Sequence, residues 1–149
     1  MVKKLLALGG DGIGPEVLES GLKILETVSK GIKVNFDIDF DLIGGICWDK
    51  YGTFCRNITI KKAKEVDAIL VGAVGGPKWD AMKIKGDQVD QDGLMCLRKK
   101  LDTFFGIRPI KYYQSLHKII PFYRKNVQNS EIIILREMCG GVMFSKPRG

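Results

Sequence analysis

Short apolar runs that end in glycine pairs recur along the chain, and they predict the buried strands of an α/β protein. Residues 5–8 form one continuous apolar run, closed by Gly9 and Gly10. Residues 68–74 form a second run, closed by a glycine pair and Pro77. Continuous runs of this length are typical of strands that are buried on both faces of a parallel sheet.

A helix is predicted after the first run, and a half-exposed strand after that helix. Pro15 occupies a favourable first helical position, and Gly31 marks the predicted end of the helix. Between them, apolar side chains recur at helical spacing, at Leu18, Leu22, Leu25 and Val28. From Ile32 to Leu42 the even positions are apolar and the odd positions polar, which is the period of a strand with one exposed face.

The rest of the chain carries further helical and strand patterns. The predicted elements are a helix over 58–66, a helix with apolar positions at Leu94, Leu97, Leu101 and Phe104, and strands over 107–113 and 131–137. Residues 78–92 are polar and irregular, and long connections of this kind often carry functional side chains. Together these elements predict an α/β fold class with a parallel-rich sheet flanked by helices.

The composition narrows the class of protein. With 149 residues, of which 45% are hydrophobic, the chain is long enough for one domain of ordinary size but hardly for two. No uninterrupted apolar stretch approaches the ~18 residues of a membrane span, so we expect no membrane partner.

The net charge of +7 raises the question of nucleic-acid binding. The 24 basic residues are scattered, and small clusters such as 98–100 lack the interleaved aromatic side chains of a base-stacking surface. We therefore expect no nucleic-acid partner. A few converging arginines would instead suit an anionic small molecule, because each guanidinium can pair bidentately with a carboxylate.

The four cysteines and the single histidine do not have the spacing of a zinc site. Cys47, Cys55, Cys96 and Cys139 are separated by 8, 41 and 43 residues, without a C-x-x-C pair and with only His117 to join them. This pattern indicates free thiols in a reducing compartment. The apolar run near the N-terminus is too short for a secretory signal, so we expect a cytoplasmic protein.

Three features carry candidate chemistry. The first is the glycine turn 10–16, where backbone amides can approach an anion, although a structural turn is the default interpretation. The second is segment 72–80, at the end of a predicted strand, where open α/β sheets bind ligands. The third is the set Arg98, Arg108 and Arg136, predicted on a helix, at a strand start and at a strand end. Three such arginines can converge on a di- or tricarboxylate.

Five segments in register resemble one family of enzymes. They are Gly-Asp-Gly-Ile-Gly-Pro-Glu-Val at 10–17, Gly-Ala-Val-Gly-Gly-Pro-Lys-Trp-Asp at 72–80, Leu-Arg-Lys at 97–99, Arg-Pro at 108–109 and Arg-Glu-x-x-Gly-Gly from 136. Together they resemble the isocitrate/isopropylmalate β-decarboxylating dehydrogenases, and segment 72–80 is most similar to the isopropylmalate branch.

This resemblance implies an NAD-dependent oxidoreductase of leucine biosynthesis that oxidises 3-isopropylmalate, releases carbon dioxide and uses Mg²⁺ or Mn²⁺. By matching position, Arg98, Arg108 and Arg136 would bind the carboxylates of this small dicarboxylate substrate, and Leu94 would contact its isopropyl group. The residues that would contact NAD are Gly76, Pro77, Lys78, Trp79, Asp80 and Gln91. The family also implies a homodimer.

Two positions of this chain differ from the pattern of the family that it resembles. Met143 stands at the position of the family's acid/base tyrosine and Gln91 at that of a glutamate, so we assign no catalytic residue. Residues 1–103 would be the N-terminal segment of the NAD-side domain, and 104–149 the beginning of the substrate and dimer domain. The remainder of both domains, including the metal ligands, would lie in a missing C-terminal part.

We therefore expect a fragment that is inactive alone. Two alternatives stay open at this point. One is a non-catalytic remnant that binds anions or a partner subunit, and the other is a β-decarboxylating dehydrogenase of the isocitrate or tartrate type.

Overall fold

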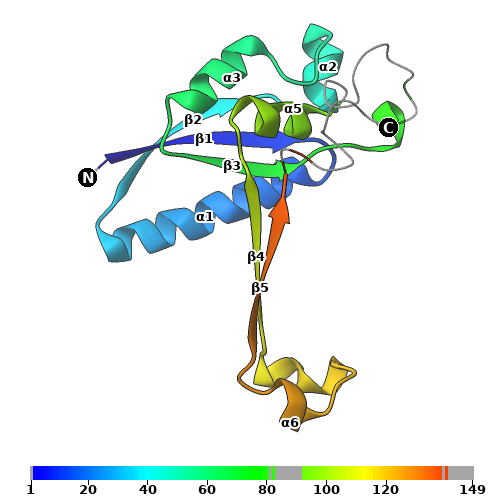
Figure 1. Ribbon diagram of the computed structural model, residues 1–149. Helices are drawn as coiled ribbons and strands as arrows, with labels where there is room; N and C mark the ends of the chain where they lie inside the picture. Colours follow the sequence, from blue (N-terminus) through cyan, green and yellow to red (C-terminus); the bar gives the residue numbers. More distant parts are fainter. Residues whose placement is uncertain (1, 81, 83–91, 139, 141–149) are drawn as a thin grey trace. The chain divides into compact units, whose positions relative to one another are not determined.

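The computed structural model describes residues 2–80, 82, 92–138 and 140 of the chain (Figure 1). The chain divides into two compact units, Met1–Asp102 and Thr103–Gly149. The described part of the first unit contains a three-stranded sheet with its helices, and that of the second contains a two-stranded sheet. The candidate site residues are therefore distributed over both units.

The sheet of the first unit is parallel, as the apolar runs predict. Its strands are β1 (Val2–Gly10), β2 (Asn35–Asp41) and β3 (Ala68–Ala73), in the spatial order β2-β1-β3. Both outer strands pair with β1 in parallel. Because β1 is central, its residues 5–8 are buried, which confirms the first predicted strand.

Helices cover both faces of this sheet. α1 (Gly14–Ile32) lies against one face, while α3 (Asn57–Lys64) and α5 (Gly93–Lys100) lie over the other (Figure 1). α2 (Gly45–Tyr51) follows β2, at the carboxyl end of the strands. The buried cluster on the side of α3 and α5 consists of Leu6, Leu8, Ile43, Cys55, Ala63 and Leu97. This cluster is the core that holds the loops described below.

Two boundaries predicted around Gly31 are wrong. α1 continues through Gly31 to Ile32 and is closed by Lys33, which has a left-handed φ of 55°. An internal glycine costs a helix only about 1 kcal/mol relative to alanine, which is too little to end it. The alternating pattern from Ile32 therefore overestimates the length of the second strand, which begins at Asn35.

β3 is less buried than its continuous apolar run predicts. All of its residues keep some exposure, because β3 forms one edge of the described sheet. β2 forms the other described edge, which agrees with its alternating, half-exposed pattern. β3 is thus confirmed as a strand, but the prediction that both of its faces are buried is wrong within the described residues.

Two helices of the first unit are absent from the predicted elements, and the helix predicted from Leu94 to Phe104 is shorter than expected. The unpredicted helices are α2 and α4 (Pro77–Asp80). α5 ends at Lys100, so Phe104 lies beyond it. Its start is fixed by Asp92, whose carboxylate accepts the N–H groups of Leu94 and Met95 at 2.9 and 3.1 Å.

The described part of the second unit is built on an antiparallel ribbon of β4 (Phe105–Lys111) and β5 (Glu131–Glu137). A 3-10 helix, η2 (Gln114–Ile119), and α6 (Arg124–Val127) connect the two strands. β5 has the predicted bounds, whereas β4 begins and ends two residues earlier than predicted.

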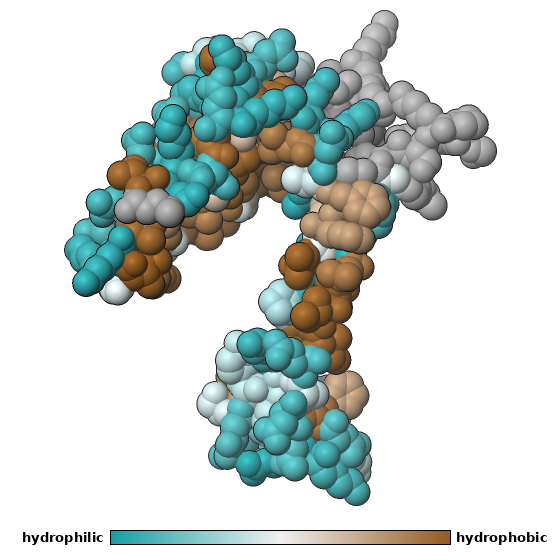
Figure 2. Space-filling model, turned by 60° about the vertical axis from the view of Figure 1, so that its left-hand side comes forward, coloured by the Kyte–Doolittle hydropathy of each residue, from teal (hydrophilic) through white to brown (hydrophobic). Residues whose placement is uncertain are grey.

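Hydrophobic side chains remain exposed on both faces of this ribbon. The register puts Ile107 opposite Leu135 on one face and Ile110 opposite Ile132 on the other. All four are about half exposed or more, and Figure 2 shows hydrophobic side chains gathered along the ribbon. Strands with this pattern are usually covered on both sides. Among the described residues, no helix has the length and apolar character needed to cross a membrane.

Candidate functional site

The loops that follow β1 and β3 meet at the carboxyl end of the first unit's sheet. The Asp11 N–H donates to the carbonyl oxygen of Ala73 at 2.6 Å, and the Gly75 N–H donates to the Asp11 carboxylate at 2.9 Å. The glycine turn and segment 72–80, predicted separately from the sequence, therefore form one structure. It occupies the end of the sheet where parallel α/β proteins bind ligands.

Two glycines allow this close approach of the two loops. A Cβ atom on Gly72 would lie 2.3 Å from the carbonyl oxygens of Gly9 and Gly14. A Cβ atom on Gly14 would lie 2.2 Å from the Gly9 carbonyl oxygen and 2.6 Å from the Ala73 nitrogen. Backbone atoms cannot move aside as a flexible side chain can, so the packing of the turn on β3 requires hydrogen atoms at both positions.

Asp11 holds the turn in place. Besides the Gly75 N–H, its carboxylate accepts the N–H groups of Gly45 at 2.8 Å and Ile46 at 2.7 Å, at the start of α2. Only 3% of the residue is exposed. These bonds satisfy orphan donors of a helix N-terminus and give Asp11 a structural role. The sequence marks Asp11 only as part of a motif, because its partners are 34, 35 and 64 residues away.

The segment expected to contact NAD continues from this structure into α4. The Trp79 ring lies over Gly45, where an added Cβ would be 2.0 Å from a ring carbon. Trp79 is therefore half-buried, whereas Pro77, Lys78 and Asp80 are exposed. The segment thus lies against α2 and leaves three of its side chains open to a ligand.

A small cleft borders this segment. It has a volume of about 160 Å³. Its lining residues are Asp11, Gly44, Gly45, Phe54, Val74, Gly75, Trp79, Asp80, Asp92 and Gly93. The cleft brings the predicted NAD segment beside the first residues of α5, the helix that carries Leu94 and Arg98. Leu94 and Arg98 are four residues apart and so share one face of α5, and both are half-buried.

The other two predicted arginines lie together on the ribbon of the second unit. Arg108 is opposite Ile134, and Arg136 is opposite Gly106, so both arginines project from the same face on adjacent strands. Arg108 is the fourth residue of β4 and so lies in the middle of the strand rather than at its start, because β4 begins earlier than predicted. The convergence of Arg98 with these two arginines stays a prediction.

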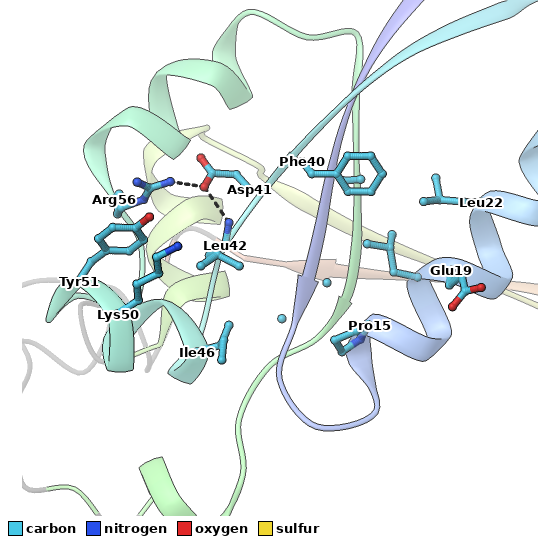
Figure 3. Close-up of a pocket in the computed structure, with 14 residues that line it drawn as sticks. Pro15, Glu19, Leu22, Phe40, Asp41, Leu42, Ile46, Lys50, Tyr51 and Arg56 are labelled. Carbon is cyan, nitrogen blue, oxygen red and sulfur yellow. Dashed lines mark hydrogen bonds and ion pairs between the residues drawn. The ribbon is translucent and has the colours of Figure 1, made fainter.

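A larger hollow of about 660 Å³ lies elsewhere, on the α1 side of the sheet. Figure 3 shows its mostly apolar wall, with Pro15, Leu22 and Phe40 toward α1 and Ile46 on α2. Of the features predicted from the sequence, only the glycine turn contributes to it, through Gly10 and Pro15. Its lining also includes Lys50, Tyr51 and Arg56, and Arg56 is already paired with Asp41. Size alone does not make it the active site.

The described cysteines form no disulfide, and burial suppresses the reactivity of two of them. Cys47 and Cys55 are buried, and Cys96 is partly buried. Burial raises the pKa of Cys55 to about 12 and also raises the pKa of Cys47. Both thiols are therefore protonated near neutral pH, which disfavours nucleophilic or metal-binding roles.

The described residues do not form a metal site. They contain no cluster of three or more histidine, cysteine, aspartate or glutamate side chains placed to hold an ion. The Asp11 carboxylate is already occupied by three backbone N–H groups. Gln91 and Met143 lie outside the described residues, so both assignments stay predictions.

Parallel strands with a glycine turn and a second loop at their carboxyl ends define an α/β protein of the open-sheet class, in which ligands bind at this end of the sheet. The family model described as isocitrate/isopropylmalate dehydrogenase matches residues 4–149. The chain belongs to this family of dehydrogenases.

Curated relatives point to one branch of the family. The chain is 40% identical over 147 residues to "3-isopropylmalate dehydrogenase" of Bacillus subtilis, covering 99% of this chain and 40% of that protein. It is 43% identical over 145 residues to the protein of the same name from Dehalococcoides mccartyi, covering 97% of this chain and 39% of that protein. The chain thus spans about two fifths of the length of these relatives.

Solved structures share the fold at lower identity. Isocitrate dehydrogenase from Methylococcus capsulatus matches with a TM-score of 0.71 and 20% identity, over 95% of this chain and 36% of that one. A β-decarboxylating dehydrogenase from Thermococcus kodakarensis, in its apo form, matches with a TM-score of 0.65 and 22% identity, over 91% and 33% of the two chains. These likenesses confirm the predicted fold class.

Proposed function

We propose that this chain supplies the cofactor segment and part of the substrate site of an NAD-dependent 3-isopropylmalate dehydrogenase. The reaction oxidises the hydroxyl-bearing carbon of the substrate to a ketone, and NAD serves as the hydride acceptor. One carboxylate then leaves as carbon dioxide, and the resulting enolate takes up a proton to give 4-methyl-2-oxopentanoate. In this proposal the step belongs to leucine biosynthesis.

One observation carries the proposal. Segment 76–80 and the start of α5 border the same cleft at the carboxyl end of the sheet. A nicotinamide held along the segment would therefore be near a substrate held by α5. The names of the relatives at about 40% identity support 3-isopropylmalate as the substrate.

The side chains of α5 and of the ribbon suit the two ends of this substrate. Leu94 offers an apolar contact for the isopropyl group, and Arg98, one turn further along the same helix face, offers a guanidinium for a carboxylate. Arg108 and Arg136 share a ribbon face and would bind a second carboxylate. The three arginines would thus orient the substrate rather than perform acid/base chemistry, since a guanidinium does not deprotonate in proteins.

The remaining parts of the proposal rest on the resemblance to the family. They are a divalent Mg²⁺ or Mn²⁺ ion held by residues outside the described chain, a homodimer, and a cytoplasmic location. Since the chain spans about two fifths of its relatives, we also propose that it acts only together with the remainder of such an enzyme.

A chimera tests the arginine assignment. Residues after 149 would be taken from the Bacillus subtilis relative, and NAD reduction would be measured with 3-isopropylmalate and with isocitrate. We expect turnover with 3-isopropylmalate only. Arg98→Ala, Arg108→Ala and Arg136→Ala should each raise the KM about 10- to 100-fold, because each loses a charge-assisted pair of about 1.5–3 kcal/mol.

Arg124→Ala is the matched control, since Arg124 is an exposed arginine of α6 outside the proposed site. Its KM should equal that of the parent chimera. An unchanged KM in the three site variants would refute the carboxylate site, and a preference for isocitrate would assign the chain to the other branch.

A further inference from the structure

Asp49 of α2 contacts two consecutive residues of the proposed NAD segment. Its carboxylate accepts a hydrogen bond from Lys78 Nζ at 2.5 Å and another from Trp79 Nε1 at 3.2 Å. Lys78 Nζ also lies 5.2 Å from the centre of the Trp79 ring, at the distance of a cation–π contact. The three side chains therefore form a closed triangle in which each touches the other two.

The α2 side of this triangle is firmly anchored. Asp11 accepts the N–H groups of Gly45 and Ile46 at the start of α2. Cys47, on the same helix, is fully buried. α2 is therefore a fixed base to which Asp49 can tie a neighbouring segment.

The α4 side has little internal stability. α4 has only four residues, and so short a helix does not persist in water without tertiary contacts. It follows Gly75 and Gly76, with φ values of 102° and 158°, which are accessible mainly to glycine and leave the chain free to adopt other conformations. The Trp79 ring on Gly45 gives packing, and Asp49 supplies the directional bonds.

We propose that Asp49 is a positioning residue that fixes the orientation of segment 76–80 toward the nicotinamide dinucleotide. This inference rests on the proposed function of that segment. Asp49 itself does not line the cleft. It acts through Lys78 and Trp79, so its loss would leave the ligand-facing groups present but wrongly oriented.

The experiment uses the 149-residue chain with Trp48→Phe, which leaves Trp79 as the only tryptophan. Trp48 stacks on Phe54, and phenylalanine preserves an aromatic stack there. Acrylamide quenching of Trp79 fluorescence reports whether the ring is held. Saturation-transfer NMR titration with NAD, extended to millimolar concentrations, reports binding through the nicotinamide protons.

Three substitutions separate the contributions of Asp49. Asp49→Ala removes both bonds, Asp49→Asn keeps a carbonyl acceptor for the indole but removes the charge, and Asp49→Glu keeps the charge. We expect Asp49→Ala to raise the quenching constant of Trp79 about twofold and the Kd for NAD about tenfold. Asp49→Asn should be intermediate, and Asp49→Glu should recover part of the loss. Asp37→Asn, the same change on an exposed part of β2, should alter neither quantity.

The outcomes distinguish a failure of the positioning role from a failure of the NAD site itself. Unchanged quenching in Asp49→Ala would overturn the anchoring role. Raised quenching with an equal Kd in all variants would overturn positioning while leaving the NAD site intact. Absence of saturable NAD signals in the parent chain would overturn both the cofactor assignment and this inference. Should Asp49→Ala not fold, Asp49→Asn, which keeps the size of the side chain, must still raise both the quenching constant and the Kd.

Discussion

Asp41 shows how a single carboxylate secures the end of a strand. It accepts the Leu42 N–H at 2.8 Å and the Thr59 hydroxyl at 3.0 Å, and it forms an ion pair with Arg56 (Figure 3). Burial disfavours its charged form, but these hydrogen bonds outweigh burial and lower the pKa of Asp41 below its ordinary value. The alternating pattern predicted Asp41 to be a solvent-facing position like Asp37.

We expect Asp41→Asn to lower the free energy of unfolding by about 1–3 kcal/mol at pH 7, since it breaks charge-assisted bonds at a buried side chain. Because the folded-state pKa is lowered, the ionised carboxylate stabilises the protein above the unfolded value of about 3.9, and this stability is lost as pH falls through the lowered pKa. Urea unfolding at pH 7 and pH 3 measures both effects.

In this experiment the stability difference between wild type and Asp41→Asn should shrink at pH 3. Asp37→Asn removes an exposed carboxylate of the same strand and should stay within about 0.5 kcal/mol of wild type. A difference that is the same at both pH values would mean that ionisation of Asp41 does not contribute to stability.

At the scale of secondary-structure elements, glycines at two positions have opposite effects on stability. Gly72 in β3 faces backbone oxygens of the glycine turn. Gly31 in α1 has open space where a Cβ would be, and its φ is that of ordinary helix. The first is required by packing, whereas the second only adds conformational freedom to the unfolded chain.

We expect Gly72→Ala to destabilise the chain by about 3 kcal/mol or more, at the upper end of overpacking effects, because only backbone atoms surround the new methyl group. Gly31→Ala should stabilise it by about 0.5–1 kcal/mol through helix propensity. Thermal and urea unfolding of the two variants give the comparison. Equal effects at the two positions would contradict the described contact between the turn and β3.

Local sequence patterns predicted the elements whose own residues carry the signal. The apolar run of β1, the run in β5 and the repeat of α1 are visible in the sequence without any partner. α2 is not, because its start is capped by Asp11, 34 residues earlier in the chain. Gly44 and Gly45, at the start of α2, indicate from the sequence alone only a break after the preceding strand.

The candidate site shows the same limit. The motif at 72–80 predicts the NAD segment, but Asp49, its contact on α2, is 29 and 30 residues from its partners and carries no motif. Arginines could be selected by type and by the expected end of an element, yet the exact start of β4 moved Arg108 into the strand. The sequence pattern does not predict contacts between residues that are far apart in the chain.

For the whole molecule, the length of the relatives sets the expectation for activity. The chain spans about 40% of the Bacillus subtilis relative. We therefore expect the 149-residue chain to produce no NADH above a control without enzyme, in an absorbance assay with 3-isopropylmalate, NAD and magnesium. Turnover by the chain alone would contradict this expectation.

Met143 is expected to limit the chimera that contains the remainder of the enzyme. A thioether cannot deliver a proton to the enolate, and a positioned acid/base group typically contributes ~10²–10⁴-fold. Met143→Tyr should raise the kcat of the chimera within that range while leaving the KM and the affinity for NAD nearly unchanged, because the group acts in the transition state. Equal kcat values would mean that another group protonates the enolate or that another step limits the rate.

The exposed ribbon of the second unit has a consequence for the behaviour of the protein in concentrated solution. Residues 132–135 form an uncharged stretch of isoleucine and leucine without proline, in a strand with unpaired backbone groups along one side in the described chain. Such segments add further strands from other molecules and grow into cross-β aggregates. Association between copies rises with concentration, whereas covering by a neighbouring part of the same enzyme does not. The protein concentration, and how early a neighbouring part of the enzyme covers the ribbon, would then determine how much protein stays in solution. Added folding stability would not.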